Sequence, residues 1–179
     1  MAPGSAQRSQ SARNSRRLTV AGRLGACALL VLASRAAAAD QARISALSDV
    51  AFGTIASFTS DWVRSQSVCL SAKSPPTNLY RITATGSGAG GSFVLDSGSE
   101  KLSYDVQWAD SSGQTAGTQL VPNQPLTAQQ SSVSSSDPGD CSKGPATTAS
   151  LIVILRSSAL AAASSGTYSG SLTLLVAPE

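Results

Sequence analysis

The residue types that could carry chemistry in this 179-residue chain are three cysteines, ten scattered carboxylates and one glycine-rich loop. There is no histidine, so Ser-His-Asp and Cys-His catalytic sets and histidine-bound metal sites are excluded. Asp137 and Asp140 are close in sequence, but a solvated loop explains them more simply than a catalytic carboxylate pair. We therefore expect no enzymatic activity, no bound metal and no cofactor.

The glycine-rich loop, Gly86-Ser87-Gly88-Ala89-Gly90-Gly91, imitates a phosphate-binding loop. A phosphate loop ends on Lys and Ser or Thr and leads into a helix whose N-terminus binds the phosphate. Neither feature follows Gly91. A flexible hairpin turn is the simpler interpretation.

Residues 1–39 are predicted to form a secretory signal peptide. Arginines make the first part basic, residues 24–33 are apolar, and residues 36–39 supply small side chains for cleavage before Asp40. The apolar run is shorter than the roughly 20 residues that a membrane-spanning helix needs. Leu24-Gly25-Ala26-Cys27 spells a lipobox, but its apolar run follows it instead of preceding it. We expect one mature domain, residues 40–179.

Removal of the signal peptide reverses the net charge. The whole chain carries 13 basic and 10 acidic residues, net +3, but six of the arginines lie in residues 1–39. The remaining chain has seven basic and ten acidic residues, net −3. With no basic cluster after residue 40, nucleic-acid binding is not expected.

Cys69 and Cys141 are the even pair that remains after Cys27 leaves with the signal peptide. In an oxidising compartment such a pair is expected to form a disulfide. The bridge would close a loop of roughly 70 residues, worth on the order of 4 kcal/mol in the chain-entropy model. Two separate buried thiols are the alternative interpretation.

Residues 80–108 hold the clearest strand pattern. Apolar and polar residues alternate in two arms, which predicts two half-buried strands with one face toward the core. A short run, Phe93-Val94-Leu95, lies between them, so we expect a three-stranded meander. The side chains expected to face the core are Tyr80, Ile82, Ala84, Leu102, Tyr104, Val106 and Trp108.

Further short strands are expected to pack on this meander. Residues 49–55 are a candidate, with Gly53 marking a bulge or a close backbone approach; residues 67–72 and 166–179 are others. Residues 149–155 (ASLIVIL) are predicted to be a strand covered on both faces. Six to eight short strands with Gly/Ser turns predict an all-β fold, a β-sandwich.

Two segments lack such a pattern. Phe58, Trp62 and Val63 are placed in a polar connector, and one helical turn or a loop is expected within residues 157–165. Residues 110–148 are rich in Ser, Gln, Thr, Gly and Pro, which is typical of a long surface loop. A bridge to Cys141 would tie this loop to the body.

Several motifs recur together in one family. They are Phe52-Gly53, the following Cys69, the stretches Tyr80-Arg81-Ile82-Thr83-Ala84-Thr85-Gly86 and Leu102-Ser103-Tyr104-Asp105-Val106, and the terminal GTYSGSLTL of residues 166–174. With them, the sequence resembles the spore coat U domain proteins, which include subunits of archaic chaperone-usher pili. The resemblance covers most of residues 49–176.

The resemblance implies an immunoglobulin-like sandwich that lacks its last strand. In that family a periplasmic chaperone, and then the N-terminal extension of the next subunit, fills the gap by strand addition. The chain's stop soon after Val176 fits this picture. The groove would be lined by Ile152 and Ile154, or by the other face of the same strand, and we choose the second set: Leu151, Val153, Leu155, Leu172, Leu174 and Val176.

The implied function is that of a structural subunit of a surface fibre, serving adhesion or biofilm formation. The implied partners are a periplasmic chaperone, an outer-membrane usher and neighbouring pilus subunits, with transit through the periplasm to the cell surface. The alternative is a free secreted or surface-associated binding module that does not polymerise and uses residues 110–148 as its contact surface.

The cysteine analysis gives a first testable prediction. Peptide mapping of the exported, non-reduced chain by mass spectrometry should find Cys69 and Cys141 in one cross-linked peptide pair, since the two are an even pair behind a signal peptide. Recovery of two free, alkylatable thiols would contradict the bridge.

Overall fold

A computed structural model describes residues 40–74, 76–133, 141 and 145–179. The expected signal peptide and the carboxylates of Asp137 and Asp140 lie outside the described residues. The described elements are β1 (Gln41–Ser45), β2 (Trp62–Lys73), β3 (Leu79–Gly86), the 3-10 turn η1 (Ala89–Gly91), β4 (Val94–Ser97), β5 (Glu100–Ser103), β6 (Asp105–Ala109), β7 (Thr118–Gln119), β8 (Pro125–Gln130), β9 (Ala149–Leu155), α1 (Ser157–Ala162) and β10 (Leu172–Pro178).

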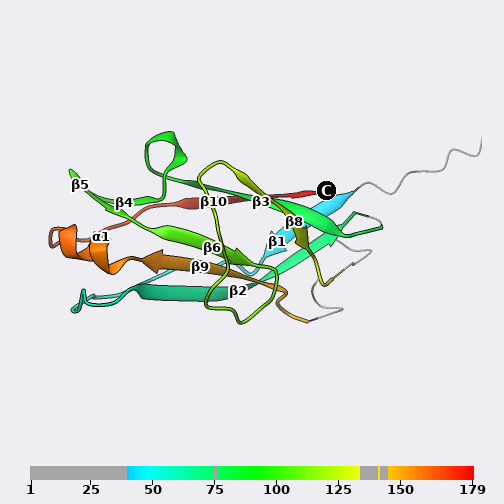
Figure 1. The fold of residues 1–179 in the computed structure, drawn as a ribbon, viewed down its shortest axis with the longest axis horizontal. Helices are drawn as coiled ribbons and strands as arrows, with labels where there is room; N and C mark the ends of the chain where they lie inside the picture. The colour runs from blue at the N-terminus through cyan, green and yellow to red at the C-terminus, as the bar shows by residue number, and fades with distance from the viewer. Residues whose placement is uncertain (1–39, 75, 134–140, 142–144) are drawn as a thin grey trace, which may run out of the picture. The chain divides into compact units, whose positions relative to one another are not determined.

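The strands form two antiparallel sheets that face each other across one core. The first sheet has the order β1-β2-β9-β6-β7 and the second the order β10-β3-β8, while β4 and β5 make a separate hairpin (Figure 1). An immunoglobulin-type sandwich has strands A, B, E and D in one sheet and C, F and G in the other. Here β1, β2, β9 and β6 correspond to A, B, E and D, and β3 and β10 to C and F. The expected all-β sandwich is confirmed.

The core contains the residues that the alternating pattern selects. Tyr80, Ile82 and Ala84 of β3 are fully buried, and so are Val106 and Trp108 of β6. Leu102 and Tyr104 are also buried. The predicted facing of both arms is therefore confirmed, and their burial removes apolar surface from water at about 25 cal/mol per Å².

One polar contact joins the two sheets inside this core. The indole Nε1 of Trp108 donates a hydrogen bond of 2.8 Å to the hydroxyl oxygen of Tyr80. Burial raises the pKa of the Tyr80 phenol to about 12, because the charged phenolate is poorly solvated there. The contact satisfies an indole N–H that would otherwise be buried without a partner.

The predicted three-stranded meander is wrong, because its arms belong to different sheets. β3 pairs with β10 and β8, whereas β6 pairs with β9 and β7. The crossing begins at Gly86, where a Cβ would lie 2.2 Å from the backbone oxygen of Ser92. Gly90 and Gly91 follow with positive φ of 64° and 78°, a conformation that other residues adopt with difficulty. The glycines therefore carry the chain from one layer to the other.

The region before residue 67 also differs from the prediction. Trp62 and Val63 do not lie in a connector, because β2 already begins at Trp62. Residues 49–55 do not form a strand. Gly53 has a φ of +70°, and a Cβ at this position would have no atom within 4 Å. Glycine is therefore favoured here by the bend of the backbone and not by a close approach of another segment.

The Ser/Gln-rich region is more ordered than its composition predicts. It contributes β7 and β8 and a loop over the outer face of β9. In that loop, the backbone N–H of Gln114 donates to Ser150 Oγ at 3.0 Å, and Ser150 Oγ donates to the carbonyl of Ser111 at 2.9 Å. All seven residues of β9 are buried, so its predicted coverage on both faces is confirmed. The predicted helical turn near residue 160 is α1.

Cys69 and Cys141 are joined by a disulfide with a Cα–Cα distance of 6.0 Å. Beside it, two hydroxyls bond the edge of β2 that faces away from β1, in the second half of the strand, beyond its pairing with β9. The N–H of Leu70 donates to Thr148 Oγ1 at 2.8 Å, and the N–H of Ala72 donates to Ser131 Oγ at 3.2 Å. The bridge therefore fastens the Ser/Gln-rich region to β2 just beyond the point where its ladder with β9 ends.

The contact between the sheets gives a second prediction. Tyr80→Phe should lower the free energy of unfolding by about 1–3 kcal/mol, because the buried Trp108 N–H loses its acceptor. Tyr168→Phe is the matched control, since the Tyr168 hydroxyl bonds the Ser164 carbonyl at an exposed position. Urea titration of both variants measures the difference; equal losses would contradict the role of the buried pair.

The same phenol predicts a pH dependence. A raised folded-state pKa favours the neutral phenol in the folded chain, so its contribution is complete below the usual value of 10 and is lost as the pH rises toward about 12. Unfolding measured across this window should show a steeper loss of stability in the unaltered chain than in Tyr80→Phe. Identical slopes would contradict the assignment.

Candidate functional site: an open apolar groove

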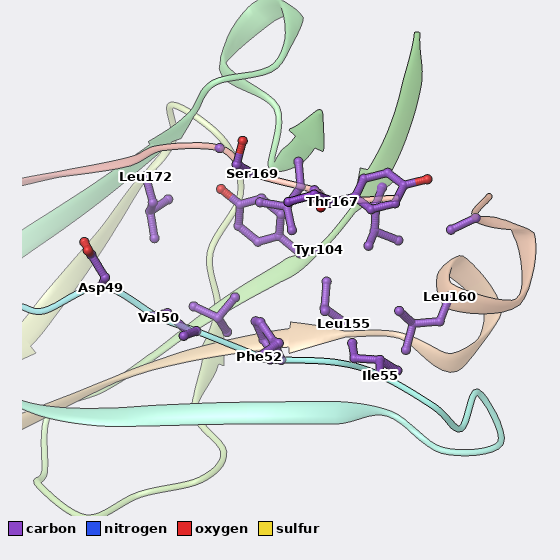
Figure 2. Close-up of a pocket in the computed structure, with 18 of the residues that line it drawn as sticks. Asp49, Val50, Phe52, Ile55, Tyr104, Leu155, Leu160, Thr167, Ser169 and Leu172 are labelled. Atoms are coloured by element: carbon purple, nitrogen blue, oxygen red, sulfur yellow. The ribbon is translucent and has the colours of Figure 1, made fainter. Parts of the chain in front are cut away.

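An apolar groove of about 1170 Å³ lies between the two layers at one end of the sandwich. Its floor is made by Leu151, Val153 and Leu155 of β9, together with side chains from the β4–β5 hairpin and the residues that follow it. Leu160 of α1 closes the end of the floor (Figure 2). The remaining floor residues are Leu95, Leu102 and Tyr104.

Two stretches of chain form the long walls of the groove. One is the segment 47–58, called here the rail, whose Val50, Phe52 and Ile55 line the space. The other is the stretch 163–174, which leads into β10 and contributes Tyr168 and Leu172. Figure 2 shows Asp49, Val50, Phe52 and Ile55 along one wall and Thr167, Ser169 and Leu172 along the other.

Five of the six residues predicted for the groove line it, and Val176 does not. The predicted set was Leu151, Val153, Leu155, Leu172, Leu174 and Val176. Val176 pairs with Ile82 further along β10 and packs against the core. β1 approaches β10, and we attribute the closure of the groove at this end to it.

Ile152 and Ile154 lie on the opposite face of β9 from the groove. Both are buried, but neither lines it. The face of β9 that lines the groove is therefore the one that carries Leu151, Val153 and Leu155.

Sequence reasoning missed the rail and the aromatic part of the lining. Val50, Phe52 and Ile55 were assigned to a core strand, and Tyr104 was recognised as buried but not as a groove residue. The spacing of Val50 and Phe52 indicated an apolar side. Nothing in the spacing indicated that this side would face an open groove, because that depends on β10 being the edge strand of its sheet.

The groove is nearly free of charge. Asp49 on the rail is the one ionisable carboxyl group among the described lining residues, and the floor is aliphatic and aromatic. Burial raises the pKa of the Tyr104 phenol, so this group stays neutral at ordinary pH. Such a lining suits apolar side chains and offers no acid–base pair for catalysis.

A charged cluster fixes the end of the groove next to α1. The guanidinium of Arg156 donates from Nε to Asp105 at 2.6 Å and from Nη1 to Asp61 at 2.8 Å. Asp61 also accepts the backbone N–H of Ser157 at 2.8 Å. That backbone hydrogen bond, and then Arg156, lower the pKa of Asp61. The cluster joins the starts of β2, β6 and α1, so Leu160 is held in place.

Both walls carry backbone groups without a strand partner among the described residues. β10 is at the end of its sheet, paired with β3 on one side only. The rail makes no backbone–backbone hydrogen bond within the described part of the chain. An open strand edge beside an apolar floor is the geometry into which an additional strand can insert.

The size of the groove also favours an extended chain. Sites for small molecules commonly occupy about 300–1,000 Å³ and place a few convergent polar groups around the ligand. This groove is larger, at about 1170 Å³, and its side-chain lining is mostly apolar. No cluster of three or more potential metal ligands occurs in the residues that the structure describes.

Within the same described ranges, no helix has the length and hydropathy to span a membrane. The fold and the groove together define a class: an immunoglobulin-like β-sandwich whose F-type edge strand borders an open apolar groove.

Comparison with known proteins adds little to this class. No family model matches the chain, and no curated protein matches it. Among solved structures, the chain is similar to one from a chaperone-tip adhesin complex described as vital for synergistic activation of CFA/I fimbriae biogenesis. That similarity has a TM-score of 0.48 and 15% identity, and covers 77% of this chain and 41% of the other. A likeness this distant assigns the chain to no family.

The two faces of β9 give a third prediction. Leu155→Ala and Ile154→Ala should each cost about 2–5 kcal/mol of stability, because both side chains are buried. Only Leu155→Ala enlarges the groove, so it alone should change the affinity for an apolar fluorescent dye such as anilinonaphthalene sulfonate. Dye titration under conditions where both variants stay folded makes the comparison; equal changes would show that the dye binds elsewhere.

Proposed function

We propose that the chain is a structural subunit of an exported surface fibre of the chaperone-usher type. It accepts an extended strand from another polypeptide into the groove between the rail and β10. The observation that carries the proposal is the unpaired edge of β10 beside an apolar, nearly uncharged floor. The role is structural, and no catalytic step is part of it.

The strand order supports this proposal. In a complete immunoglobulin-type sandwich, a G strand lies next to F in the sheet that also contains C. β10 occupies the F position, and no described strand lies on its other side. An inserted strand would supply the backbone partners that the G strand supplies in the complete fold.

The side-chain pattern supports it as well. Leu172 and Leu174 point toward the groove. Leu175, which follows Leu174, lies on the outer face of the sheet and is 66% exposed. A strand that alternates apolar and polar residues would place its apolar side chains on Leu151, Val153 and Leu155. An inserted strand would also cover the apolar area that the half-buried wall residues Phe52, Leu172 and Leu174 still expose, which is worth about 25 cal/mol per Å².

The motifs shared with the spore coat U domain proteins suggest which partners supply the strand. They are a periplasmic chaperone during transit and neighbouring pilus subunits after passage through an outer-membrane usher. The chain would then reach the cell surface, where the fibre serves adhesion or biofilm formation. The predicted signal peptide and the disulfide between Cys69 and Cys141 agree with an exported protein.

A strand-addition assay tests the function. The chain, expressed in full and recovered after export, is mixed with a synthetic peptide of about ten residues in which valine alternates with threonine. Its melting temperature should rise with peptide concentration as mass action requires. Leu174→Asp should abolish the rise, because it places a carboxylate in the apolar wall of the groove. Leu175→Asp is the matched control on the outer face and should retain it.

The same peptide with its central residue replaced by proline should bind far more weakly, since proline removes a backbone donor and fixes φ. A melting temperature that ignores every alternating peptide would contradict strand addition. The free binding module that uses residues 110–148 would then be the better interpretation.

A further inference from the structure

The rail is held by side chains of β2. In the first half of β2, Trp62, Arg64 and Gln66 pair directly with Leu155, Val153 and Leu151 of β9. Paired residues share a face of the sheet, so these three side chains belong to the inner, core-facing side. In the second half of β2, the same face carries the buried Val68, Leu70 and Ala72. Arg64 and Gln66 therefore break the apolar pattern on an inward-facing row.

Gln66 binds the start of the rail as a neighbouring strand would. The N–H of Ser48 donates to Gln66 Oε1 at 3.0 Å, and Gln66 Nε2 donates to the carbonyl of Ser48 at 3.1 Å. The Ser48 hydroxyl adds a third bond to Oε1 at 2.9 Å. One amide group thus replaces a pair of ladder hydrogen bonds at a point where the two backbones do not pair.

Arg64 holds the middle of the rail. Its Nε donates to the carbonyl of Ala51 at 3.3 Å. Its guanidinium carbon lies 5.8 Å from the ring centroids of both Phe52 and Trp62, within the range of cation–π attraction. Phe52 also lines the groove, so Arg64 holds one side chain of the groove wall from behind.

The backbone of the rail bends at two places. Ala46, directly before it, has a φ of +63°, and Gly53 within it has a φ of +70°. A positive φ at alanine is unfavourable and persists only where the surroundings impose it. It marks the point where the chain leaves its pairing with β2 at the end of β1. The first part of the rail, residues 47–52, thus lies between two bends, and side chains fasten it to β2.

We propose that Gln66 and Arg64 are positioning residues that keep the rail against β2 and so keep the groove open for an incoming strand. The proposal rests on the proposed strand addition and names what prepares the site for it. Val50 and Phe52 are half-buried and pack against the core from the rail side. Without these two side chains, they would shift into the open space of the groove, because that movement buries more of their own apolar surface. An incoming strand would then have to displace the rail first.

The expected signature is kinetic. When only a fraction of the molecules has an open groove, the observed association rate equals the intrinsic rate multiplied by that fraction. After insertion, the new strand itself covers the floor, so dissociation depends little on Gln66 and Arg64. In Arg64→Ala/Gln66→Ala, association of the alternating valine–threonine peptide should slow by about tenfold, with a much smaller change in dissociation.

The single variants and controls separate positioning from general loss of stability. Gln66→Glu keeps the acceptor for the Ser48 N–H and loses the donor to the Ser48 carbonyl, so its association rate should lie between those of the unaltered chain and Gln66→Ala. Gln129→Ala is the matched control, since among the described residues its side-chain amide bonds the nearby Thr127 carbonyl on β8. It should leave both rate constants unchanged.

Hydrogen exchange tests the same contact without any peptide. In the free, unaltered chain and in Gln129→Ala, the Ser48 amide should exchange slowly compared with the other amides of the rail, because it donates to Gln66. In Gln66→Ala it should exchange as fast as its neighbours. Equal Ser48 exchange in the unaltered chain and Gln66→Ala would overturn the proposal, whether or not the variants bind peptide.

The outcomes distinguish the two proposals. If the unaltered chain binds the peptide and Arg64→Ala/Gln66→Ala binds it at the same rate, the positioning role is wrong and strand addition stands. If the double variant changes dissociation as much as association, the two residues are general stabilisers and the positioning role is again wrong. If the unaltered chain binds no alternating peptide, strand addition is wrong and the positioning role is wrong with it.

Discussion

The hydrogen bond between the Trp108 indole and the Tyr80 hydroxyl joins the two sheets inside the core. It lies in a fully buried part of the core, where an unpaired donor would be costly. Tyr80 pairs with Pro178 at one end of the β3–β10 ladder, and Leu172 pairs with Gly86 at the other. The sheets are therefore fastened at the Tyr80 end, and the groove lies toward the Gly86 end.

At the open end of the sandwich, the two walls of the groove are held in different ways. A sandwich normally closes by adding strands to its edges, but here one edge of the groove is β10 and the other is a segment fastened by Gln66 and Arg64. Side-chain hydrogen bonds of this kind are individually weak and exposed. They bond the backbone groups of Ser48 and Ala51 and leave the other backbone groups of the segment without a backbone partner among the described residues. The arrangement keeps the groove walls apart while it remains unfilled.

Much of the fold could be predicted because alternation is a local property. Tyr80, Ile82, Val106 and Trp108 face the core as their spacing indicates, and β9 is buried on both faces as its apolar run indicates. The assignment of those strands to sheets could not be predicted in the same way. Whether β3 and β6 neighbour each other depends on the path of the chain at Gly86 and on pairing with β9 and β10, which are distant in sequence.

The groove was predictable only in part for a related reason. Alternation along a strand predicts which residues share a face. The residues chosen for the groove-facing side of β9 and β10, Leu151, Val153, Leu155, Leu172 and Leu174, do line the groove. Val176 has the same parity but lies further along β10, away from the lining, and alternation alone contains no information about how far a groove extends. The inward Arg64 and Gln66 were visible as polar residues, but their partner, the Ser48–Phe52 backbone, becomes evident only from the fold.

The open edge of β10 also has a consequence for symmetry. A groove that receives a strand and a strand that enters a groove are different surfaces, so a contact of this kind between two copies would be heterologous. A single contact of this kind does not satisfy both surfaces of both copies, as a two-fold dimer contact would, because each copy keeps one free surface after the contact forms. Unless the rotation between copies closes a ring, repetition gives a filament with two unlike ends, one showing an empty groove and the other an unused strand. Growth of that filament would have a direction set by a single unpaired strand.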